Sequence, residues 1–184
     1  MVLSTDDEAL AEEGRQVGAQ VPFVRPAALA TDTATAVDVA RHALAALAVE
    51  EGYLVLLQPT SPLRTSEDID TCIKACTRSS AGACVSVQEV DKTPYWMFTR
   101  GEDGVLRPFV EDRPIPSARQ LAPPVYLLNG AVYVVDIGMF QKAGTFVPTG
   151  VSSHIMGQER SIDIDSAADL DAARRLVEKT SPAS

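Results

Sequence analysis

The sequence is poor in several residue types on which particular functions depend. It has only two histidines, and neither lies in a recognisable Ser/His/Asp or Cys/His catalytic motif. No apolar run approaches the roughly 20 residues that a membrane-spanning helix requires. Acidic residues outnumber basic ones by 25 to 16, and the resulting net charge of −9 disfavours binding to nucleic acid or an anionic membrane. We therefore expect neither of these partners.

Cysteine is scarce as well. The chain has three cysteines, Cys72, Cys76 and Cys84, and an odd number cannot all pair in disulfides. No signal sequence follows Met1. We therefore expect reduced thiols and a cytoplasmic location. Cys72 and Cys76 lie four residues apart on an expected helix, but no further Cys or His stands near them at metal-site spacing. This pattern favours buried packing thiols over a zinc site. The length of 184 residues fits one domain, residues 1–184.

The most informative stretch runs from Leu54 to Arg64. Residues 54–57 form a short apolar run, which is typical of a strand buried on both faces. In residues 58–64 two prolines then stiffen a turn that carries an amide, two hydroxyls and a guanidinium. Ligands of open α/β sheets bind beyond the carboxyl ends of strands, so Gln58 and Arg64 are candidates to bind a polar anion. The alternative is a polar, proline-rich loop that only caps the strand.

The remaining apolar patterns alternate between strands and helices. Strands are expected over residues 2–4, 21–23, 83–90, 126–135 and 162–165, and helices over residues 8–17, 34–49, 66–76 and 166–177. Alternation of this kind predicts an α/β fold with a mostly parallel sheet and helices on both faces. Asn129-Gly130 interrupts the strand over residues 126–135, which indicates a β-bulge or a close approach of the backbone to a ligand.

Residues 91–124 are too long for a plain connection within a compact domain. They are rich in proline and aromatic residues, and Gly101 to Gly104 could form the turn of a hairpin. Three interpretations stay open for this inserted segment. It is a lid over the site, an arm that packs on a second subunit, or a locally packed excursion.

Two carboxylates suggest a metal site. Asp163 and Asp165 alternate with Ile162 and Ile164, so a strand would place both carboxylates on one face. Adjacent carboxylates repel each other unless a cation lies between them, and Mg²⁺ is usually held by such a pair together with substrate phosphates. The alternative is that Asp165 caps the last helix while Asp163 faces solvent.

Several stretches together resemble a known family in one order along essentially the whole chain. They are Val2-Leu3-Ser4-Thr5-Asp6-Asp7, residues 25–34, Leu57-Gln58-Pro59-Thr60-Ser61-Pro62-Leu63-Arg64, Pro94-Tyr95-Trp96, Arg119-Gln120, residues 129–134 and Ser161-Ile162-Asp163-Ile164-Asp165. They resemble the acylneuraminate cytidylyltransferases, which are the CMP-sialic acid synthetases. CMP-Kdo synthetases share the fold and the Thr-Asp-Asp stretch but differ at the central turn.

The resemblance implies a Rossmann-like fold of the nucleotide-diphospho-sugar transferase type. It also implies a reaction in which the anomeric hydroxyl of a nonulosonic (sialic-type) acid attacks the α-phosphate of CTP, giving a CMP-sugar and pyrophosphate. The implied cofactor is Mg²⁺. The implied assembly is a homodimer, with residues 91–124 as an arm exchanged across a two-fold axis.

The resemblance also assigns roles to individual residues. The sugar acid would contact Gln58, Tyr133, Asn129 and Arg64, the metal would be held by Asp163 and Asp165, and the nucleotide would lie near Arg25, Asp32 and Thr35. Arg119 would pair with the carboxylate of the sugar acid or with a phosphate, and would act in catalysis together with the two aspartates.

Two departures from the family pattern matter. The family's opening strand, Gly-, Arg- and Lys-rich phosphate loop and helix have no counterpart before Val2, which implies an N-terminally truncated chain. The leading explanation is a misassigned start or a fragment of an active full-length enzyme, and whether this chain is active alone stays open. Leu127 stands where the family usually has an arginine, which weakens binding of CTP. The alternative is a non-catalytic relative that binds a sugar acid or dimerises with a complete synthetase. The intact pair of Asp163 and Asp165 argues for the enzyme.

Overall fold

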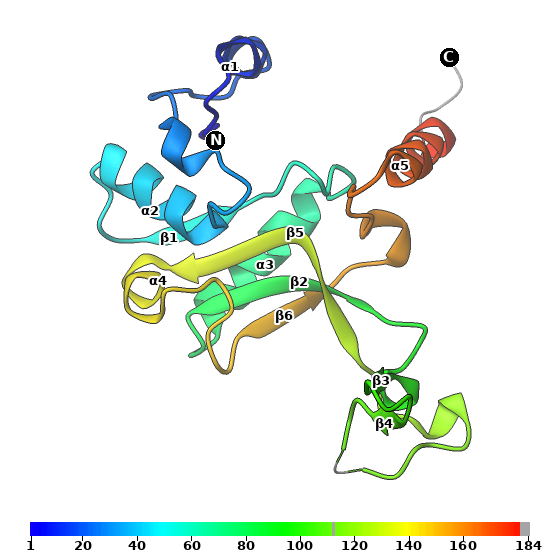
Figure 1. The fold of residues 1–184 in the computed structure, drawn as a ribbon. Coiled ribbons are helices and arrows are strands. Elements are labelled where there is room, and N and C mark those ends of the chain that lie inside the picture. The colour runs from blue at the N-terminus through cyan, green and yellow to red at the C-terminus, as the bar shows by residue number, and fades with distance from the viewer. Residues whose placement is uncertain (112, 181–184) are drawn as a thin grey trace.

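A four-stranded sheet with the strand order β1-β5-β2-β6 forms the centre of the computed structural model, which describes residues 1–111 and 113–180 (Figure 1). Strand β1 is Tyr53–Leu56, β2 is Ala83–Glu89, β5 is Tyr126–Asp136 and β6 is Ser152–Ile155. Strands β2 and β6 pair in parallel, and β5 pairs antiparallel with both β1 and β2. Three strands therefore run in one direction and β5 runs against them.

This pairing corrects the expected mostly parallel sheet, because two of the three neighbouring pairs are antiparallel. The cause lies in the connection before β5. The chain leaves β2, passes through the inserted segment and returns directly beside β2 without a helix that crosses the sheet. A strand that returns in this way runs antiparallel to the strand it left, whereas a parallel neighbour needs a crossover.

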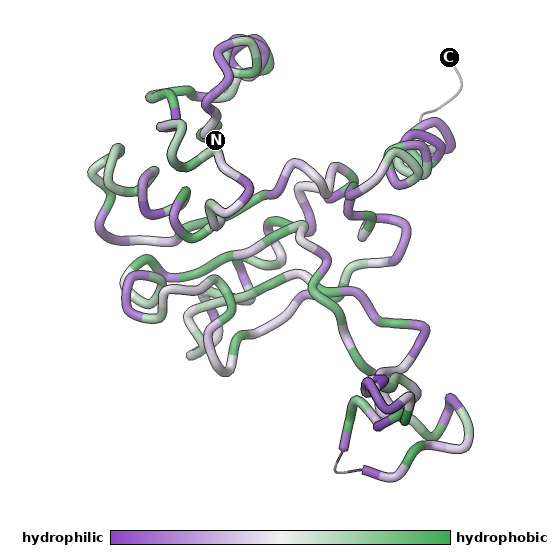
Figure 2. The backbone as a smooth tube through the Cα atoms, in the orientation of Figure 1, coloured by the Kyte–Doolittle hydropathy of each residue, from purple (hydrophilic) through white to green (hydrophobic). Residues whose placement is uncertain are grey.

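Helices cover both faces of the sheet, as expected. Helices α2 (Ala36–Ala46) and α4 (Ile137–Ala143) pack on one face and α3 (Ser66–Arg78) packs on the other. Successive side chains of a strand point to opposite faces, so Leu54 joins the first apolar cluster and Val55 joins the second. The hydrophobic residues in Figure 2 accordingly gather along the central strands.

The cysteines lie in the second of these clusters. Cys72, Cys76 and Cys84 are buried and unoxidised, and they pack between α3 and β2. Their burial matches the expected packing role. Among the described residues, no group of three or more His, Cys, Asp or Glu side chains could hold a metal ion.

Other elements differ in detail from the sequence expectations. Helices α1 (Glu8–Gln16) and α5 (Ala167–Thr180) are present, but residues 21–23 and 162–165 are not strands. Strand β6 and helix α4 were not expected, because their short patterns lie in an irregular stretch of sequence. Near the N-terminus, a single parallel bridge joins Val2 and Gln20. Within residues 1–111 and 113–180, no helix is both long and apolar enough to cross a bilayer.

The inserted segment contains the expected hairpin. Strands β3 (Phe98–Arg100) and β4 (Leu106–Pro108) pair antiparallel around the Gly101–Gly104 turn. Trp96 Nε1 donates a hydrogen bond of 2.8 Å to Pro116 O, which ties the two ends of the excursion together. The hairpin stands away from the four-stranded sheet (Figure 1). In this structure it is therefore an outlying arm with its own local contacts.

Phe140 tests the first apolar cluster. Its ring is fully buried and lies 4.8 Å from that of Phe146. We expect Phe140→Ala to lower the free energy of unfolding by about 3–5 kcal/mol, because it removes buried apolar surface and leaves a cavity. Phe109, with 63% of its surface exposed, is the matched control. Phe109→Ala should change stability by less than about 0.5 kcal/mol in urea unfolding at low protein concentration. Equal losses would contradict this assignment of the core.

Candidate functional site

Three segments meet at one end of the sheet, beyond the carboxyl ends of β1 and β6. They are the turn after β1 (residues 57–64), the interruption of β5 at Asn129-Gly130, and residues 161–165, which precede α5. The backbone N–H of Ile164 donates a 2.8 Å hydrogen bond to Thr60 O, which joins the third segment to the first. This is the edge at which α/β sheets bind ligands.

Gly130 lies at the centre of this site. Its φ of +73° is in the left-handed region, which favours glycine. A Cβ added there would lie 2.7 Å from Gln58 Oε1, 3.1 Å from Ser61 Oγ and 3.3 Å from Asp163 Oδ2. Two oxygens from the turn after β1 and one from residues 161–165 therefore lie close to the backbone of Gly130. The structure brings Gln58 and Asp163 together at Gly130.

The interruption of β5 is a β-bulge. The register shifts between Val85, which pairs with Tyr133, and Val87, which pairs with Leu128. Ser86 lies between them, and its hydroxyl accepts a 2.8 Å hydrogen bond from the backbone N–H of Val132. Of the two interpretations of Asn129-Gly130, the bulge is confirmed.

Asn129 is the buried centre of this bulge. Its Oδ1 accepts a hydrogen bond from Ser86 Oγ at 2.6 Å, and its Nδ2 donates to Ser161 Oγ at 3.0 Å. Ser161 Oγ in turn donates to Gly157 O at 2.9 Å. Only 2% of Asn129 is exposed. The side chain expected to contact substrate is therefore placed in the interior, where it ties β2, β5 and residues 157–161 together.

Arg64 holds the turn in shape. Its Nη1 donates to the backbone carbonyls of Gln58 at 2.7 Å, Ser61 at 2.8 Å and Ala131 at 3.1 Å. Burial lowers the pKa of this guanidinium, but an arginine stays charged in a protein. The structure thus places Arg64 beneath the site, with these hydrogen-bond donors turned toward the backbone.

Tyr133 is the second residue expected to line a sugar pocket, and it lies close to Asp163. Half-burial raises the pKa of Tyr133, and the negative charge of Asp163 raises it further. Its hydroxyl therefore stays protonated at neutral pH and can donate a hydrogen bond. Gln58 and Asp163 lie beside Gly130, and Tyr133 interacts electrostatically with Asp163. We call these four residues the Gly130 site.

The two aspartates have the exposure that a metal site needs. Asp163 and Asp165 are exposed, while Ile162 and Ile164 are partly buried, although residues 161–165 do not form a strand. The helix-cap alternative does not apply to Asp165, because Ser166 and Asp169 form the capping hydrogen bonds of α5. Two exposed carboxylates fit a hard cation such as Mg²⁺ whose other ligands are water and phosphate.

Arg119 lies elsewhere. Its Nη2 pairs with Asp91 Oδ1 at 2.9 Å at the base of the arm, and both side chains are more than 60% exposed. It lines an open pocket of about 530 Å³ with Glu89, Gln120 and other residues of the arm. Among the described residues, no contact joins Arg119 to the Gly130 site.

The three residues expected near the nucleotide lie in the N-terminal part of the chain. Arg25 Nη2 pairs with Asp6 Oδ1 at 3.0 Å, and Asp32 is exposed in a turn. Thr35 is the N-cap of α2, where its Oγ1 accepts from the backbone N–H of Asp38 at 3.1 Å. Their contacts in this structure are local.

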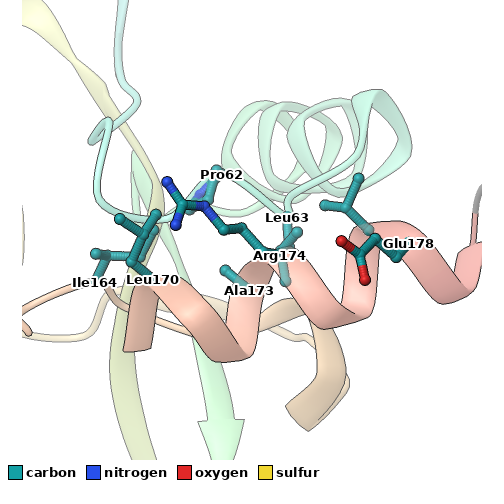
Figure 3. A pocket seen from close by; sticks show the side chains of 8 residues that line it. Pro62, Leu63, Ile164, Leu170, Ala173, Arg174 and Glu178 are labelled. Carbon is teal, nitrogen blue, oxygen red and sulfur yellow. The ribbon is translucent and has the colours of Figure 1, made fainter. Parts of the chain in front are cut away.

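A separate apolar pocket of about 310 Å³ lies behind the turn. Pro62 and Leu63 form one wall, and Ile164 with Leu170 and Ala173 of α5 forms another, with Arg174 and Glu178 at the edge (Figure 3). Ile164 lines this pocket, whereas its neighbour Asp163 lies near Gly130, so the same segment borders both.

Sequence reasoning missed Ser86, Ser161 and Asp68, which support the site from below. The two serines hydrogen-bond Asn129. Nothing in the local sequence marks Ser86, whereas Ser161 opens a stretch that carries the family resemblance but received no role of its own. Asp68 did leave a signal, because it lies four residues before Cys72 and thus on the apolar stripe of α3. An acidic residue on a buried stripe requires partners from other elements.

No protein-family model matches the chain. The chain is 26% identical over 186 residues to the post-translational flagellin modification protein B of Campylobacter coli, covering 97% of this chain and 77% of that protein. It is 28% identical over 184 residues to the CMP-N,N'-diacetyllegionaminic acid synthase of Legionella pneumophila, covering 97% and 78%. It is 30% identical over 169 residues to the N-acylneuraminate cytidylyltransferase of Streptococcus agalactiae, covering 91% and 40%. It therefore spans most of the first two relatives and less than half of the third.

Arg64 gives a test of the turn. We expect Arg64→Ala to lower the free energy of unfolding by about 1.5–3 kcal/mol, because the carbonyls of the turn and of Ala131 lose a charged donor. Arg174 pairs with Asp171 at 3.5 Å and is 66% exposed, so Arg174→Ala should cost less than about 1 kcal/mol in the same urea titration. A cost for Arg64→Ala no larger than that of the control would refute the structural role.

Proposed function

This chain belongs to the acylneuraminate cytidylyltransferase family, and we propose on that basis that it transfers CMP from CTP to a nonulosonic (sialic-type) sugar acid and releases pyrophosphate. The relatives from Legionella pneumophila and Streptococcus agalactiae carry names of this kind, and the similarity extends over most of the chain. The observation that supports the proposal in the structure is the convergence of Gln58 and Asp163 on Gly130. Gln58 lies 72 positions before Gly130 in the sequence, and Asp163 lies further along the chain. Only the fold brings all three residues together.

In the proposed reaction, the anomeric hydroxyl oxygen of the sugar acid attacks the α-phosphorus of CTP. The bond from that phosphorus to the bridging oxygen of the β-phosphate breaks, and pyrophosphate leaves. Gln58 offers both a donor and an acceptor to the sugar acid, and the protonated hydroxyl of Tyr133 can donate to it. The bare backbone of Gly130 allows the substrate to approach closely. The protein's contribution is then mainly positioning of the two substrates.

Two carboxylates beside a triphosphate need a compensating cation. Asp163 and Asp165 would hold Mg²⁺, which supplies charge neutralisation at the phosphates when bound. Both carboxylates are exposed and only two residues apart, so they can share a cation with a phosphate. We assign the two aspartates as catalytic residues. Arg119 joins them only if the arm brings its guanidinium to the phosphates.

The nucleotide is proposed to lie near Arg25, Asp32 and Thr35. The proposed assembly is a cytoplasmic homodimer in which the arm packs on the second subunit. Exposed apolar side chains on the arm and the adjoining start of β5 support this arrangement; they are Trp96, Met97, Phe98, Val105, Leu106, Phe109, Ile115, Leu121, Tyr126, Leu127 and Leu128. Exposed apolar side chains in such number within one segment favour an interaction site there.

A second candidate is a non-catalytic relative that binds a sugar acid or dimerises with a complete synthetase. Two observations favour it. Arg64 and Arg119 are both engaged with groups of the protein itself, and Leu127, at the position where the family usually has an arginine, is 53% exposed on β5. The site then has few free cations for a triphosphate. Binding of a sugar acid without release of pyrophosphate from CTP would favour this candidate.

Asp165 tests the catalytic assignment. We expect Asp165→Ala to abolish release of pyrophosphate from CTP in the presence of sialic-type acids and Mg²⁺, since removing a proposed ligand of the metal leaves the phosphate charge uncompensated. Asp165 is exposed, so the melting temperature should stay within about 2 °C of the unmutated protein.

Asp171, which is also exposed and lies on α5, is the control. Asp171→Ala should retain full turnover. Persistent turnover of Asp165→Ala would remove the metal assignment from this residue. Lack of turnover in the unmutated protein with every acid tested would overturn the proposed catalytic function.

Gly130 separates site geometry from stability. Gly130 and Gly150 have φ values of +73° and +79°, so alanine at either position should cost about 1–3 kcal/mol of backbone strain. Only at Gly130 would the new Cβ meet Gln58, Ser61 and Asp163, since nothing lies within 4 Å of a Cβ at Gly150. The clash is with movable side chains, so we expect similar stability losses but loss of turnover or sugar-acid binding in Gly130→Ala alone. Equal activity of the two variants would refute the Gly130 site.

A further inference from the structure

Within the residues that the structure describes, the same helix cap occurs three times. In each case a Ser or Thr side chain accepts from the backbone N–H of an aspartate three residues later, and the aspartate accepts from the backbone N–H of the cap. The pairs are Thr35 with Asp38, Thr65 with Asp68, and Ser166 with Asp169. The cap uses only the Oδ2 atom of each aspartate. The second carboxylate oxygen is therefore available for another purpose.

Asp68 differs from the other two aspartates in its surroundings. It is buried, with 3% of its surface exposed, whereas the cap bonds of Asp38 and Asp169 lie at the exposed surface. Its Oδ1 binds His154 Nε2 at 3.0 Å and Arg160 Nη2 at 3.3 Å. Among the described residues, neither Asp38 nor Asp169 has a hydrogen-bonded side chain from another element. Only Asp68 joins its helix to β6 and to the residues that follow β6.

Two partners of Asp68, Arg160 and Thr65, lie close to the Gly130 site in the sequence. Arg160 immediately precedes Ser161, whose hydroxyl binds Asn129, and Asp163 follows two residues later. At the other end, Thr65 directly follows Arg64, which clamps the turn that carries Gln58. The Asp68 carboxylate thus links the end of one site segment to the beginning of the other.

A buried carboxylate needs compensation, and this one has it. Burial alone would raise the pKa of Asp68, but the hydrogen bonds from His154 and Thr65 and the charge of Arg160 outweigh burial and lower the pKa below its ordinary value of 3.8. The group is therefore ionised at neutral pH. All of its partners lose a charged acceptor if the carboxylate is replaced, and buried networks of this kind hold their members in one arrangement.

We propose that Asp68 is a positioning residue that fixes residues 157–165, and with them the Asp163 carboxylate, relative to the turn that carries Gln58. It acts through Arg160 and His154 and does not contact substrate. The part of this inference that concerns Asp163 as a metal ligand rests on the proposed function. The part that concerns the order of residues 157–165 does not.

The test compares Asp68→Asn with Asp38→Asn. Both substitutions remove the carboxylate of a Thr capping box, so any effect of the cap itself is common to the two. We expect native-state hydrogen exchange in the peptide over residues 157–165 to speed up by about tenfold or more in Asp68→Asn, relative to a peptide from β2. Exchange in this peptide should be unchanged in Asp38→Asn. The Ile164 N–H, which binds Thr60 O, is the most informative amide.

Arg160→Met provides a second variant in case Asp68→Asn does not fold. Arg160 is 35% exposed at its side chain, and Asp68 would keep its bonds to Thr65 and His154. We expect faster exchange over residues 157–165 here also, by a smaller factor. If both folded variants exchange like Asp38→Asn in this peptide, the proposal is wrong.

The link to the site is measured without turnover. Titration with Mn²⁺ alone, followed by electron paramagnetic resonance, should give an affinity about 10- to 100-fold weaker in Asp68→Asn than in Asp38→Asn, as is typical when a group that orients a metal ligand is lost. In a turnover assay the change should appear in the metal requirement and kcat, with the KM for CTP little altered. Unaltered Mn²⁺ affinity in a variant with faster exchange would overturn the link to Asp163. Absence of Mn²⁺ binding and turnover in the unmutated protein would instead refute the proposed function and leave the exchange result standing.

Discussion

The structure depends on how β5 satisfies its hydrogen bonds where its pairing with β2 is interrupted. Ser86 and Asn129 supply side-chain partners at this bulge, with Ser86 binding the backbone N–H of Val132 and Asn129 binding Ser161. A buried polar group without a partner costs about 1–3 kcal/mol, so a bulge in the middle of a sheet persists only with such support. The same bonds that satisfy β5 also hold residues 157–161 against it. The left-handed Gly130 at the bulge then leaves the space in which Gln58 and Asp163 meet.

The residues that support the site are different from the exposed residues that we propose for its chemistry. Arg64, Asn129 and Asp68 are buried or half-buried and direct their hydrogen bonds inward, to carbonyls, hydroxyls and each other's segments. Asp163 and Asp165 are exposed and have no such structural bonds within the described part of the chain. This division places rigid polar networks beneath side chains that must remain free for a cation or substrate. Arg64 is an example. The sequence predicted that this cation binds a ligand, whereas in the structure it holds the shape of the turn that carries it.

Local sequence patterns predicted much of the fold. Apolar runs predicted β1, β2 and β5, and apolar stripes predicted α2 and α3, because each pattern reflects which face of one element is buried. Asn129-Gly130 predicted the bulge, and Gly101 to Gly104 predicted the turn of a hairpin, whereas the sequence left open where that hairpin packs. The direction of β5 was not predictable in the same way, since it depends on the absence of a crossover and not on the residues of β5. Strand β6 was missed because four residues with mixed exposure carry little periodic signal.

For the Gly130 site, the sequence by itself determined which side chains we propose for the chemistry. Gln58, Tyr133 and the Asp163–Asp165 pair are identified by residue type, spacing and resemblance to the cytidylyltransferases. Only the tertiary structure decided which polar residues contribute to the site and which support it, because that depends on where Oδ1 of Asp68 or Nη1 of Arg64 finds its partner. Those partners come from elements up to 92 residues away, as with Asp68 and Arg160, and their bonds form only once the sheet has brought these elements together.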